Sequence, residues 1–280
     1  MTDAALPPPG PGADLRLAVH EAAPPAFASL CWDVFFASRG RGVSMQAHFP
    51  WLAAPRQACF VTLWSAAGLL AGCAIRFIVD AASQRRSGAL GLVCVDSRHR
   101  GRGHATRVLE RAVDHAASLG LADLVLWTSQ PGVYARHGFR PDDDAVLGTI
   151  AMPPGAAAVA GQALERVDWP DAGDPRGLPP FAASGVRWRS PGASAIVLQG
   201  ADGPILAEWT GPDGDVADLL QQAMPATWRL NALAGDTLPQ ALAVRGCAVD
   251  LAPTRLRMIR PLEAPGAPPR RYDLRVLDRI

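Results

Sequence analysis

The sequence predicts an α/β fold in which a mixed central sheet is flanked by helices and is followed by a smaller α/β segment. Three observations predict it. An amphipathic helix opens near Ala105 and stops at Gly120, and β-rich apolar runs stand on both sides of it. A stretch rich in proline, glycine and alanine over 153–180 separates this part from a second folded part. With 280 residues, 49 % apolar and 19 % charged, the chain can bury one large core or two modest ones.

The first part, residues 14–152, is predicted to be one domain that follows a flexible Pro/Gly-rich tail over 1–13. Apolar residues recur on one face from Pro25 to Arg39, which predicts a helix. The apolar face of the amphipathic helix comprises Ala105, Val108, Leu109, Ala112, Val113 and Ala116. The remaining elements of this domain are expected to be strands at 60–64, 75–79, 89–95, 124–127 and 145–152 and a short helix at 132–136.

The second part, residues 181–262, is expected to follow a linker over 153–180 and to precede a basic, proline-rich tail over 263–280. Its clearest local signal is the turn Gly200–Gly203 between two apolar runs, which predicts a hairpin. Its elements are predicted as strands at 195–198, 205–209, 228–233 and 255–260 and helices at 216–224 and 238–244.

The charge composition excludes several classes of function. The formal net charge is +1, so no overall field attracts nucleic acid or an anionic membrane. The chain contains no lysine, and all 27 basic residues are arginine. This excludes Schiff-base chemistry, lysine-anchored pyridoxal phosphate, a Walker P-loop and the protein-kinase lysine. Only Tyr134 and Tyr272 are tyrosines, so a tyrosine at a motif position carries information.

The uncharged segment from Ala58 to Ile75 is long enough to span a bilayer. A β-hairpin explains it better, because β-rich residues flank a small turn at Ser65–Gly68 and Arg76 follows within the second run. Strands covered on both faces are apolar throughout and resemble a spanning helix in composition. The sequence therefore predicts no membrane span.

The cysteines are odd in number and show neither metal-ligand nor CxxC spacing. We expect reduced, mostly buried thiols, as in a cytoplasmic protein. The opening segment has no basic n-region or apolar h-region, which agrees with a cytoplasmic location. No pair of histidines has zinc-ligand spacing with a third ligand nearby, so no metal is expected. The five cysteines are Cys31, Cys59, Cys73, Cys94 and Cys247.

The most informative stretch lies between the strand at 89–95 and the amphipathic helix. Glycines at 101 and 103 permit a tight turn and the close approach of a ligand, and the first free N–H groups of the helix point into that turn. The result is an anion site suited to a pyrophosphate, with arginines around it. The pattern there is Arg-x-x-Gly-x-Gly, formed by Arg98, Gly101 and Gly103.

This pattern resembles the acyl-CoA loop of the GNAT superfamily of acyltransferases. Tyr134 stands four residues before Gly138-Phe139, which is similar to the second signature of that family. The resemblance covers residues 15–152 and implies a GNAT-like fold that binds acetyl-CoA as co-substrate. It implies that the strand binds the pantetheine arm through backbone groups and that the loop holds the pyrophosphate; His104 departs slightly from the small or aliphatic residue usual at its position. The implied cofactor-binding residues are Val93, Cys94, Val95, Arg98, Arg100, Gly101, Arg102, Gly103, His104, Ala105 and Thr106.

The expected reaction moves an acetyl group from acetyl-CoA to a primary amine by direct attack. A backbone N–H near Val95 is expected to stabilise the oxyanion. Tyr134 is expected to protonate the departing thiolate, because phenol and thiol pKa values lie within about two units of each other. Cys94 has no base placed to activate it as a nucleophile. The general base is not identified, and three candidates remain open: Asp33, His48 and Asp96.

Two other functions stay open at this point. One is a non-catalytic sensor in which the same loop binds acyl-CoA without reaction. The other is RNA binding by the arginines at 98–102, although aromatics are not interleaved there. The expected partner is a small-molecule or peptide amine, with no nucleic acid and no membrane, and the oligomeric state is open. Arg39 and Arg41 suggest an anionic portion on the acceptor.

The second part repeats the order of elements of the first. Arg245-Gly246-Cys247 stands in the place of His137-Gly138-Phe139, and Leu242 then stands in the place of Tyr134. The segment before Val216 contains no arginine-glycine loop. We therefore expect a degenerate GNAT half-repeat that holds no pyrophosphate, with an unrelated α/β cap as the alternative.

Overall fold

The computed structural model describes residues 15–54, 56–79, 85–153, 163–171, 174–263 and 274–280. The first half of the chain contains β1 (Arg16–His20), α1 (Pro25–Phe35), η1 (Ala37–Arg39), α2 (Met45–His48), η2 (Pro50–Ala53), β2 (Ala58–Ser65), β3 (Gly68–Val79), β4 (Arg86–Val95), η3 (Ser97–His99), α3 (His104–Ser118), β5 (Asp123–Trp127), α4 (Pro131–Ala135), β6 (Arg140–Pro141) and β7 (Ala145–Ala151). The remainder contains β8 (Glu165–Trp169), β9 (Ala182–Arg189), β10 (Ser194–Gly200), β11 (Gly203–Thr210), α5 (Asp213–Ala223), β12 (Thr227–Leu233), α6 (Leu238–Val244), β13 (Ala248–Pro253), β14 (Arg257–Pro261) and η4 (Val276–Asp278).

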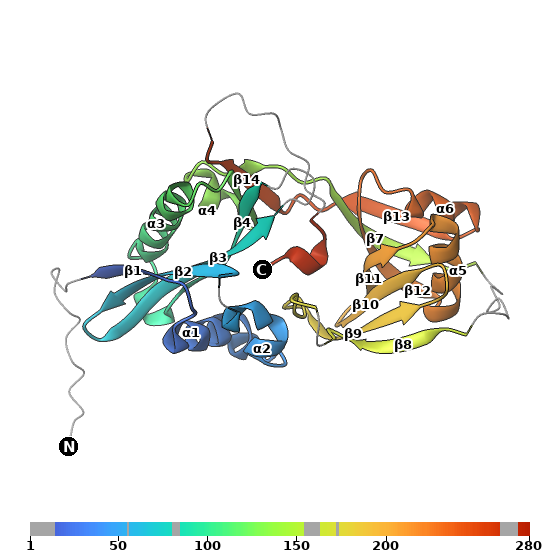
Figure 1. Ribbon diagram of the computed structural model, residues 1–280, viewed down its shortest axis with the longest axis horizontal. Helices are drawn as coiled ribbons and strands as arrows, with labels where there is room; N and C mark the ends of the chain where they lie inside the picture. The colour runs from blue at the N-terminus through green and yellow to red at the C-terminus, as the bar shows by residue number, and fades with distance from the viewer. Residues whose placement is uncertain (1–14, 55, 80–84, 154–162, 172–173, 264–273) are drawn as a thin grey trace, which may run out of the picture.

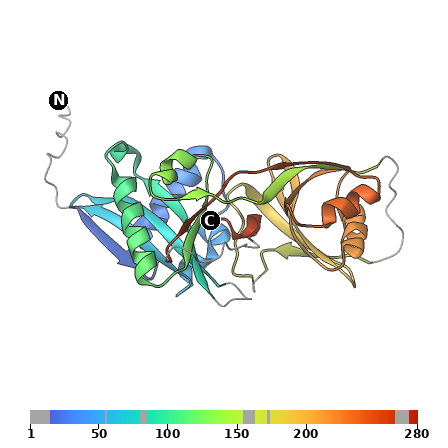
Figure 2. The ribbon, with the colours of Figure 1, turned by 90° about the horizontal axis from the view of Figure 1, so that it is seen from above.

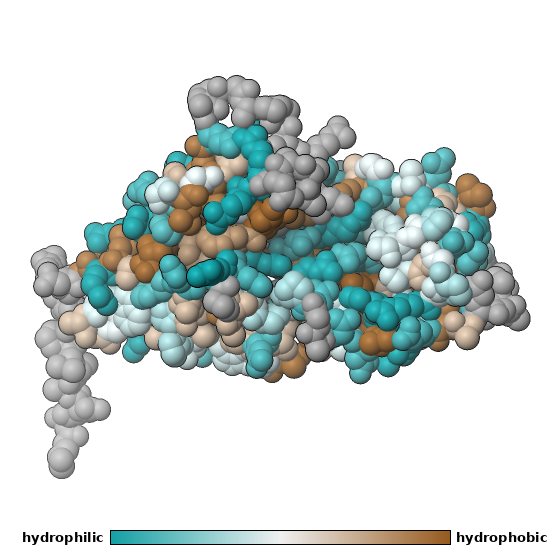
Figure 3. Space-filling view, in the orientation of Figure 1, coloured by the Kyte–Doolittle hydropathy of each residue, from teal (hydrophilic) through white to brown (hydrophobic). Residues whose placement is uncertain are grey.

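These strands form two seven-stranded mixed sheets, each flanked by helices, which confirms the predicted α/β fold class (Figure 1). Sheet A has the order β1-β2-β3-β4-β5-β14-β6, and sheet B has the order β13-β7-β12-β11-β10-β9-β8. We call the part built on sheet A the first half and the part built on sheet B the second half. The two halves lie side by side along the long axis, and the surface where they meet is mainly hydrophilic on the face shown in Figure 3.

The two halves exchange one strand each. β7 follows β6 in the chain but lies between β12 and β13 in sheet B, antiparallel to both. β14 follows β13 but lies between β5 and β6 in sheet A. The strand expected at 145–152 therefore does not close the first sheet, and the strand expected at 255–260 does not belong to the second (Figures 1 and 2). The local sequence predicts that a segment forms a strand. Which strands it pairs with is decided by contacts between residues that are far apart in the sequence.

A single carboxylate joins the two crossing connections. Asp143, between β6 and β7, accepts hydrogen bonds from the Thr254 hydroxyl and from the N–H groups of Leu256 (2.6 Å) and Arg257 (3.1 Å), at the connection between β13 and β14. It also accepts the N–H of Ala145 at 3.1 Å. The buried Arg257 side chain pairs with Asp144 at 2.9 Å. The exchange thus rests on charged hydrogen bonds as well as on strand pairing.

Each sheet is covered by helices. α3 packs on one face of sheet A and buries Val108, Leu109, Ala112, Val113 and Ala116, which confirms its predicted apolar face, while Ala105 is partly exposed. α1 covers the opposite face together with an aromatic cluster around Phe49 and Trp51, which are both 2 % exposed and belong to the core. α5 and α6 cover one face of sheet B, and its other face receives Leu178, Val276 and Leu277.

The apolar segment starting at Ala58 is a β-hairpin, because β2 and β3 pair in antiparallel register from Ala58↔Arg76 to Ser65↔Gly68. No helix among the described residues is long and apolar enough to cross a membrane. All five cysteines are free and buried, as expected.

The expected linker and the expected C-terminal tail both contain residues that pack on the sheets. Residues 165–169 of the expected linker form β8, which pairs with β9. In the expected tail over 263–280, residues 274–280 pack between the halves and bury Leu274, Val276 and Leu277, and Arg275 pairs with Asp236 of the second half at 2.7 Å. The proline-rich stretch before them dominates the composition, so the alternating apolar residues were missed. The tail expected over 1–13 lies outside the described residues.

Candidate functional site

The central feature of the first half is the divergence of β4 and β5. These parallel strands pair only at Gly88↔Leu124 and Ala89↔Val125. Beyond Ala89 the edge of β4 that faces β5 has no strand partner within the described residues. Backbone N–H and C=O groups along this edge are left to bind another molecule.

A bulge in β4 contributes to this divergence. The β3–β4 register shifts between Gly72↔Cys94 and Ala74↔Gly91, so Cys73 faces two residues of β4. Leu92, one of these two, has φ +52°, which is uncommon for a branched residue. The bulge reverses the alternation of side chains: Leu90 packs on the α3 side, whereas Leu92 and Cys94 pack on the α1 side.

The bulge was missed in the sequence, although Gly91 inside a strand was a signal for it. Gly91 is needed because the chain of residues 274–280 passes directly over it. A Cβ at this position would stand 2.5 Å from the backbone oxygen of Ile280. Residue 280 therefore lies against β4 beside the bulge.

The start of α3 is open and uncapped. Gly103 is its N-cap, with φ +75° and no side-chain hydrogen bond, and Gly101 has φ +74°. A Cβ on either glycine would meet nothing within 4 Å, so the left-handed backbone alone requires them, and space remains above the loop. The first N–H groups of α3, which begins at His104, have no capping partner from this loop. The positive end of the helix dipole is thus available for an anion.

His104 adds a buried donor or acceptor at this point. Its side chain is 7 % exposed, and its Nδ1 atom has no hydrogen-bond partner in the described part of the chain. Burial, reinforced by Arg107, His99 and Arg102, lowers the pKa of His104. An unsatisfied buried nitrogen beside an open helix terminus fits a site that is completed by a ligand.

The arginines of the loop differ in their roles. Arg98 is exposed and is held by Asp96, with its Nη2 atom 2.7 Å from Oδ2. The Arg100 Nε atom lies 3.5 Å from the carbonyl oxygen of Val95, and Arg102 is exposed on the loop. The structure therefore leaves Arg100 and Arg102 at the loop surface and engages Arg98 in an internal pair.

Tyr134 lies on α4 and packs against the core under α3. Its ring meets Phe139 edge-on, with centroids 6.1 Å apart. Burial raises the pKa of Tyr134, and the Cys73 thiol raises it further. Since Cys73 is the residue of β3 opposite the bulge, Tyr134 approaches the point where β4 and β5 diverge. A phenol with a raised pKa stays protonated at neutral pH and can donate a proton.

The three candidate bases stand in different surroundings. The ring of His48 is buried between two backbone groups: the Val43 N–H donates to Nε2 at 3.0 Å, and Nδ1 lies 2.9 Å from the Leu178 carbonyl. The Arg98 hydrogen bond lowers the pKa of Asp96 and keeps that carboxylate occupied. Asp33 is exposed on α1. Cys94 lies on the α1 side, 3.7 Å from the Cys31 sulfur, away from the α3 face.

The second half repeats the turn that follows α4, with Leu242 in the place of Tyr134. After α6 the N–H groups of Arg245 (3.1 Å) and Cys247 (3.1 Å) both donate to the Leu242 carbonyl. After α4 the N–H groups of His137 (2.9 Å) and Phe139 (3.4 Å) donate to the Tyr134 carbonyl in the same pattern. Gly138 and Gly246 have φ +81° and +82°.

The start of α5 also differs from that of α3. β11 and β12 are parallel and pair at only two positions, as β4 and β5 do. Asp213 and Asp215 occupy the first turn of α5, where the first half carries arginines before its helix. Two carboxylates there repel a pyrophosphate, so this half has the fold without the anion site.

Comparison with known proteins agrees with this architecture. Residues 25–139 match the model of the Acetyltransferase (GNAT) family. No curated protein matches the sequence. Among the described residues there is no group of three or more His, Cys, Asp or Glu side chains that could hold a metal ion.

Several solved structures share the fold over most of the chain. A GCN5-related N-acetyltransferase from Kribbella flavida is 10 % identical with a TM-score of 0.61, covering 89 % of this chain and 71 % of its own. Eis1 from Mycobacterium abscessus is 14 % identical with a TM-score of 0.61, covering 89 % and 74 %. A tandem GNAT protein from the clavulanic acid biosynthesis pathway is 10 % identical with a TM-score of 0.58, covering 90 % and 99 %. The chain therefore has the fold of the GNAT superfamily, built as two tandem halves, and the match to the acetyltransferase family model lies in the first half.

Proposed function

We propose that this protein is an N-acetyltransferase that moves an acetyl group from acetyl-CoA to a primary amine. One observation carries the proposal: the open, glycine-bounded start of α3 stands beside the unpaired edge of β4. A single extended ligand with a diphosphate at one end and an amide-rich arm at the other would satisfy both features. Coenzyme A has this shape and chemistry.

The first half offers separate groups to each part of the ligand. The N–H groups of His104, Ala105 and Thr106 would bind the diphosphate, with Arg100 and Arg102 supplying charge. The backbone of Val93, Cys94 and Val95 would pair with the pantetheine amides, as an added strand pairs with a sheet edge. Arg98 would hold the loop in place through Asp96.

The chemistry is acyl transfer by direct attack. The nitrogen of a neutral amine attacks the thioester carbonyl, and the resulting oxyanion accepts a hydrogen bond from a backbone N–H at the β4 bulge. The C–S bond then breaks, and Tyr134 gives its proton to the departing sulfur. The amine proton leaves to solvent, and the phenol recovers a proton from solvent. The raised pKa of Tyr134 supports this role, because the acid form persists at the pH where amines become neutral.

Loss of the amine proton to solvent shapes the expected pH dependence. Only the neutral form of the acceptor amine reacts. The rate of acetyl transfer therefore rises with pH until the acceptor amine is fully deprotonated. A group that titrates near neutrality on the protein is not needed for this step. The identity of the acceptor then decides where the acidic limb of the profile lies.

The test combines binding with turnover in the full chain. Calorimetry with coenzyme A measures binding, and release of free thiol from acetyl-CoA in the presence of a panel of amines measures transfer. We expect both binding and amine-dependent thiol release. Tight binding without transfer to any amine would support an acyl-CoA sensor instead, and failure to bind coenzyme A would contradict both functions.

A further inference from the structure

The diverging strands of the first half are covered on both faces. α3 packs on one face of sheet A, where Leu124 and Leu126 of β5 belong to the core under it. On the opposite face, Ala89 and Val125 stand at the last paired position before β4 and β5 separate. We call the space between the two strands beyond this pair the fork. A side chain that covers the fork on the face opposite to α3 therefore borders the site proposed for the thioester.

Ile280 covers the fork on this face. Its half-buried side chain packs against the apolar cluster that contains Ala89 and Val125 and against the cluster that contains Leu92. Ile280 thus reaches from the last paired position of the strands to the bulge of β4. A Cβ on Gly91 would stand 2.5 Å from the Cγ1 atom of Ile280, so this side chain lies directly on the β4 backbone.

The second half holds the segment that carries Ile280. Arg275 donates to both carboxylate oxygens of Asp236, at 2.7 and 3.0 Å, and its guanidinium lies 4.4 Å from the centre of the Trp209 ring. Leu277, which is 2 % exposed, packs on sheet B. A bidentate ion pair that also stacks on an aromatic ring fixes an arginine more firmly than a single surface ion pair does. Contacts with both halves therefore fix the position of Ile280.

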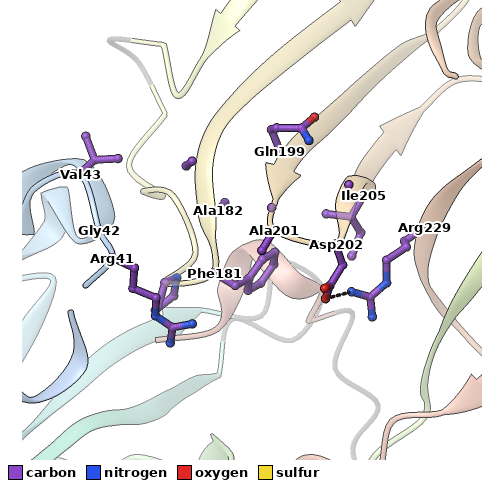
Figure 4. Close-up of a pocket in the computed structure, with 14 residues that line it drawn as sticks. Arg41, Gly42, Val43, Phe181, Ala182, Gln199, Ala201, Asp202, Ile205 and Arg229 are labelled. Carbon is purple, nitrogen blue, oxygen red and sulfur yellow. Dashed lines mark hydrogen bonds and ion pairs between the residues drawn. The ribbon is translucent and has the colours of Figure 1, made fainter. Parts of the chain in front are cut away.

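Free space lies on the other side of this segment. Val276 and Arg279 line a cavity of about 190 Å³. At Phe181 and Arg229 this cavity adjoins one of about 460 Å³, which the turn at 41–43 lines from the first half and strands β9–β12 line from the second (Figure 4). The segment therefore stands as a wall between the fork and the cavities between the halves.

An apolar wall at this position suits the acyl group of a thioester. The backbone N–H groups of β4 are available to the thioester carbonyl, and the rest of the acyl group has no polar atom. The methyl end of an acetyl group is then left to pack on apolar side chains. Each further methylene group would have to displace the side chain of Ile280, and overpacking of a fixed apolar contact is costly.

We propose that Ile280 is a specificity-determining residue that limits the acyl group of the donor to acetyl by closing the fork opposite to α3. This inference rests on the proposed acetyltransferase function. The donor is then acetyl-CoA, and butyryl-CoA and longer thioesters are excluded. The second half contributes to this specificity because it holds the segment that carries Ile280.

The same apolar cluster offers a matched control for Ile280. Ile259 on β14 belongs to the cluster of Ala89 and Val125, and its register partner is Val125. Since β5 lies between β14 and β4 in sheet A, Ile259 does not border the fork. The variants Ile280→Ala and Ile259→Ala therefore remove the same side chain from the surroundings of one cluster, and only the first removes it from the fork.

The experiment uses the full chain and compares acetyl-, propionyl- and butyryl-CoA as donors to the amine that is acetylated fastest. In the wild type we expect kcat/KM for butyryl-CoA to lie at least about tenfold below that for acetyl-CoA, because an apolar pocket discriminates by about tenfold or more per methylene group. Ile280→Ala should raise the ratio of butyryl to acetyl transfer at least about tenfold. Ile280→Val should raise the ratio of propionyl to acetyl transfer about threefold. Ile259→Ala should lower the Tm and change neither ratio.

Calorimetry measures the same contact without an acceptor. Butyryl-CoA should bind the wild type at least about tenfold more weakly than acetyl-CoA, and this difference should fall to within about twofold in Ile280→Ala. Binding of coenzyme A, which has no acyl chain, should be the same in all variants. If no amine is acetylated, these affinities decide the role of Ile280, and if Ile280→Ala does not fold, the propionyl ratio of Ile280→Val decides it.

The inference is overturned if the wild type uses or binds butyryl-CoA as well as acetyl-CoA, or if shortening Ile280 leaves the chain-length ratios unchanged. It is also overturned if Ile259→Ala and Ile280→Ala have equal effects on these ratios. In each of these cases, binding of coenzyme A and transfer of acetyl groups to an amine would leave the acetyltransferase function standing. Failure of the wild-type chain to bind coenzyme A would instead contradict the function itself.

Discussion

Tyr134 and Leu242 occupy equivalent positions in the two halves. Each is followed by a glycine with φ close to +80°, and the carbonyl of each accepts the N–H groups of the third and fifth residues after it. The backbone of this turn is therefore preserved while the hydroxyl group exists in the first half alone. The proposed proton donor of the first half therefore has no counterpart at this position of the second half.

Replacing Tyr134 by Phe should lower kcat about a hundredfold, because the thiolate then leaves without a proton donor. The KM for acetyl-CoA should stay within about twofold, since the ring and its packing on Phe139 remain. Thiol release at saturating acetyl-CoA measures this. Tyr272→Phe, which removes the only other tyrosine hydroxyl, is the control. Unchanged turnover in Tyr134→Phe would remove the proposed role of the phenol.

The pH profile of the wild type should show no alkaline fall before about pH 10, because burial raises the pKa of Tyr134 above its ordinary value of 10.0. The proton-donating form is present below that folded-state pKa and is lost only as pH rises through it. A decline in kcat that begins near pH 8 and disappears in Tyr134→Phe would contradict the raised pKa.

Replacing Gly103 by Ala should weaken binding of coenzyme A about tenfold. The left-handed φ of +75° costs an alanine about 1–2 kcal/mol, and relaxing it moves the first N–H groups of α3. Gly120→Ala is a matched control at the other end of α3, since Gly120 has φ +66° and a Cβ there also meets open space. Calorimetry should show weaker binding for Gly103→Ala alone, and thermal unfolding should show similar losses for both. If Gly103→Ala and Gly120→Ala weakened coenzyme A binding equally, the loop at Gly103 would not be the nucleotide-binding site.

Replacing Asp143 by Ala should lower the free energy of unfolding by about 3 kcal/mol, because four donors at the crossing connections lose their acceptor. Asp168→Ala is the control: Asp168 is 87 % exposed and makes one surface ion pair, so its loss should cost less than about 0.5 kcal/mol. Urea unfolding at neutral pH measures both. Equal losses would show that the crossing connections do not depend on this carboxylate.

The Asp143 contribution should also depend on pH. Burial by itself raises the pKa of Asp143, but its hydrogen bonds outweigh burial and hold the pKa below the ordinary 3.8. A lowered folded-state pKa stabilises the protein above pH 3.8, and this stability is lost as pH falls through the folded-state value. The difference between wild type and Asp143→Ala should therefore shrink in acid.

Replacing His48 by Gln should lower thermal stability but leave the acidic limb of the kcat profile in place. The imidazole joins the Val43 N–H to the Leu178 carbonyl, so it serves the packing of the first half on the chain before β9. Burial lowers the pKa of His48, so its stabilising effect is present above pH 6.5 and is lost as pH falls through the folded-state pKa. An acidic limb that vanished in His48→Gln would identify this histidine as the base after all.

Much of the first half could be predicted from its sequence because its signals are local. The face of α3, the hairpin of β2 and β3 and the turn after Tyr134 each follow from spacing within a few residues. The repeat of that turn at Leu242 was visible for the same reason. These features depend on backbone geometry that short segments specify.

The rest depends on contacts far apart in the chain. Nothing near Ala145 indicates that its strand pairs with β12, and nothing in the proline-rich approach to residue 274 indicates that Ile280 reaches Gly91. The cavity that Arg41 of the first half and Arg229 of the second both line could not be predicted without the topology. His48 is a similar case, because the sequence names it as a candidate base but does not show its contacts with the Val43 N–H and the Leu178 carbonyl.

The strand exchange also sets the order in which the strands of sheet A become available during synthesis. When β5 leaves the ribosome, the strand that will cover its edge has not been synthesised, because β14 comes from the far end of the second half. Until β14 is synthesised, the edge of β5 at Leu124–Leu126 has no strand partner. An unpaired apolar edge of this kind is prone to pair with the wrong strand. Neither half therefore builds its whole sheet from one continuous stretch of chain, and synthesis of the second half must be nearly complete before the first sheet can close.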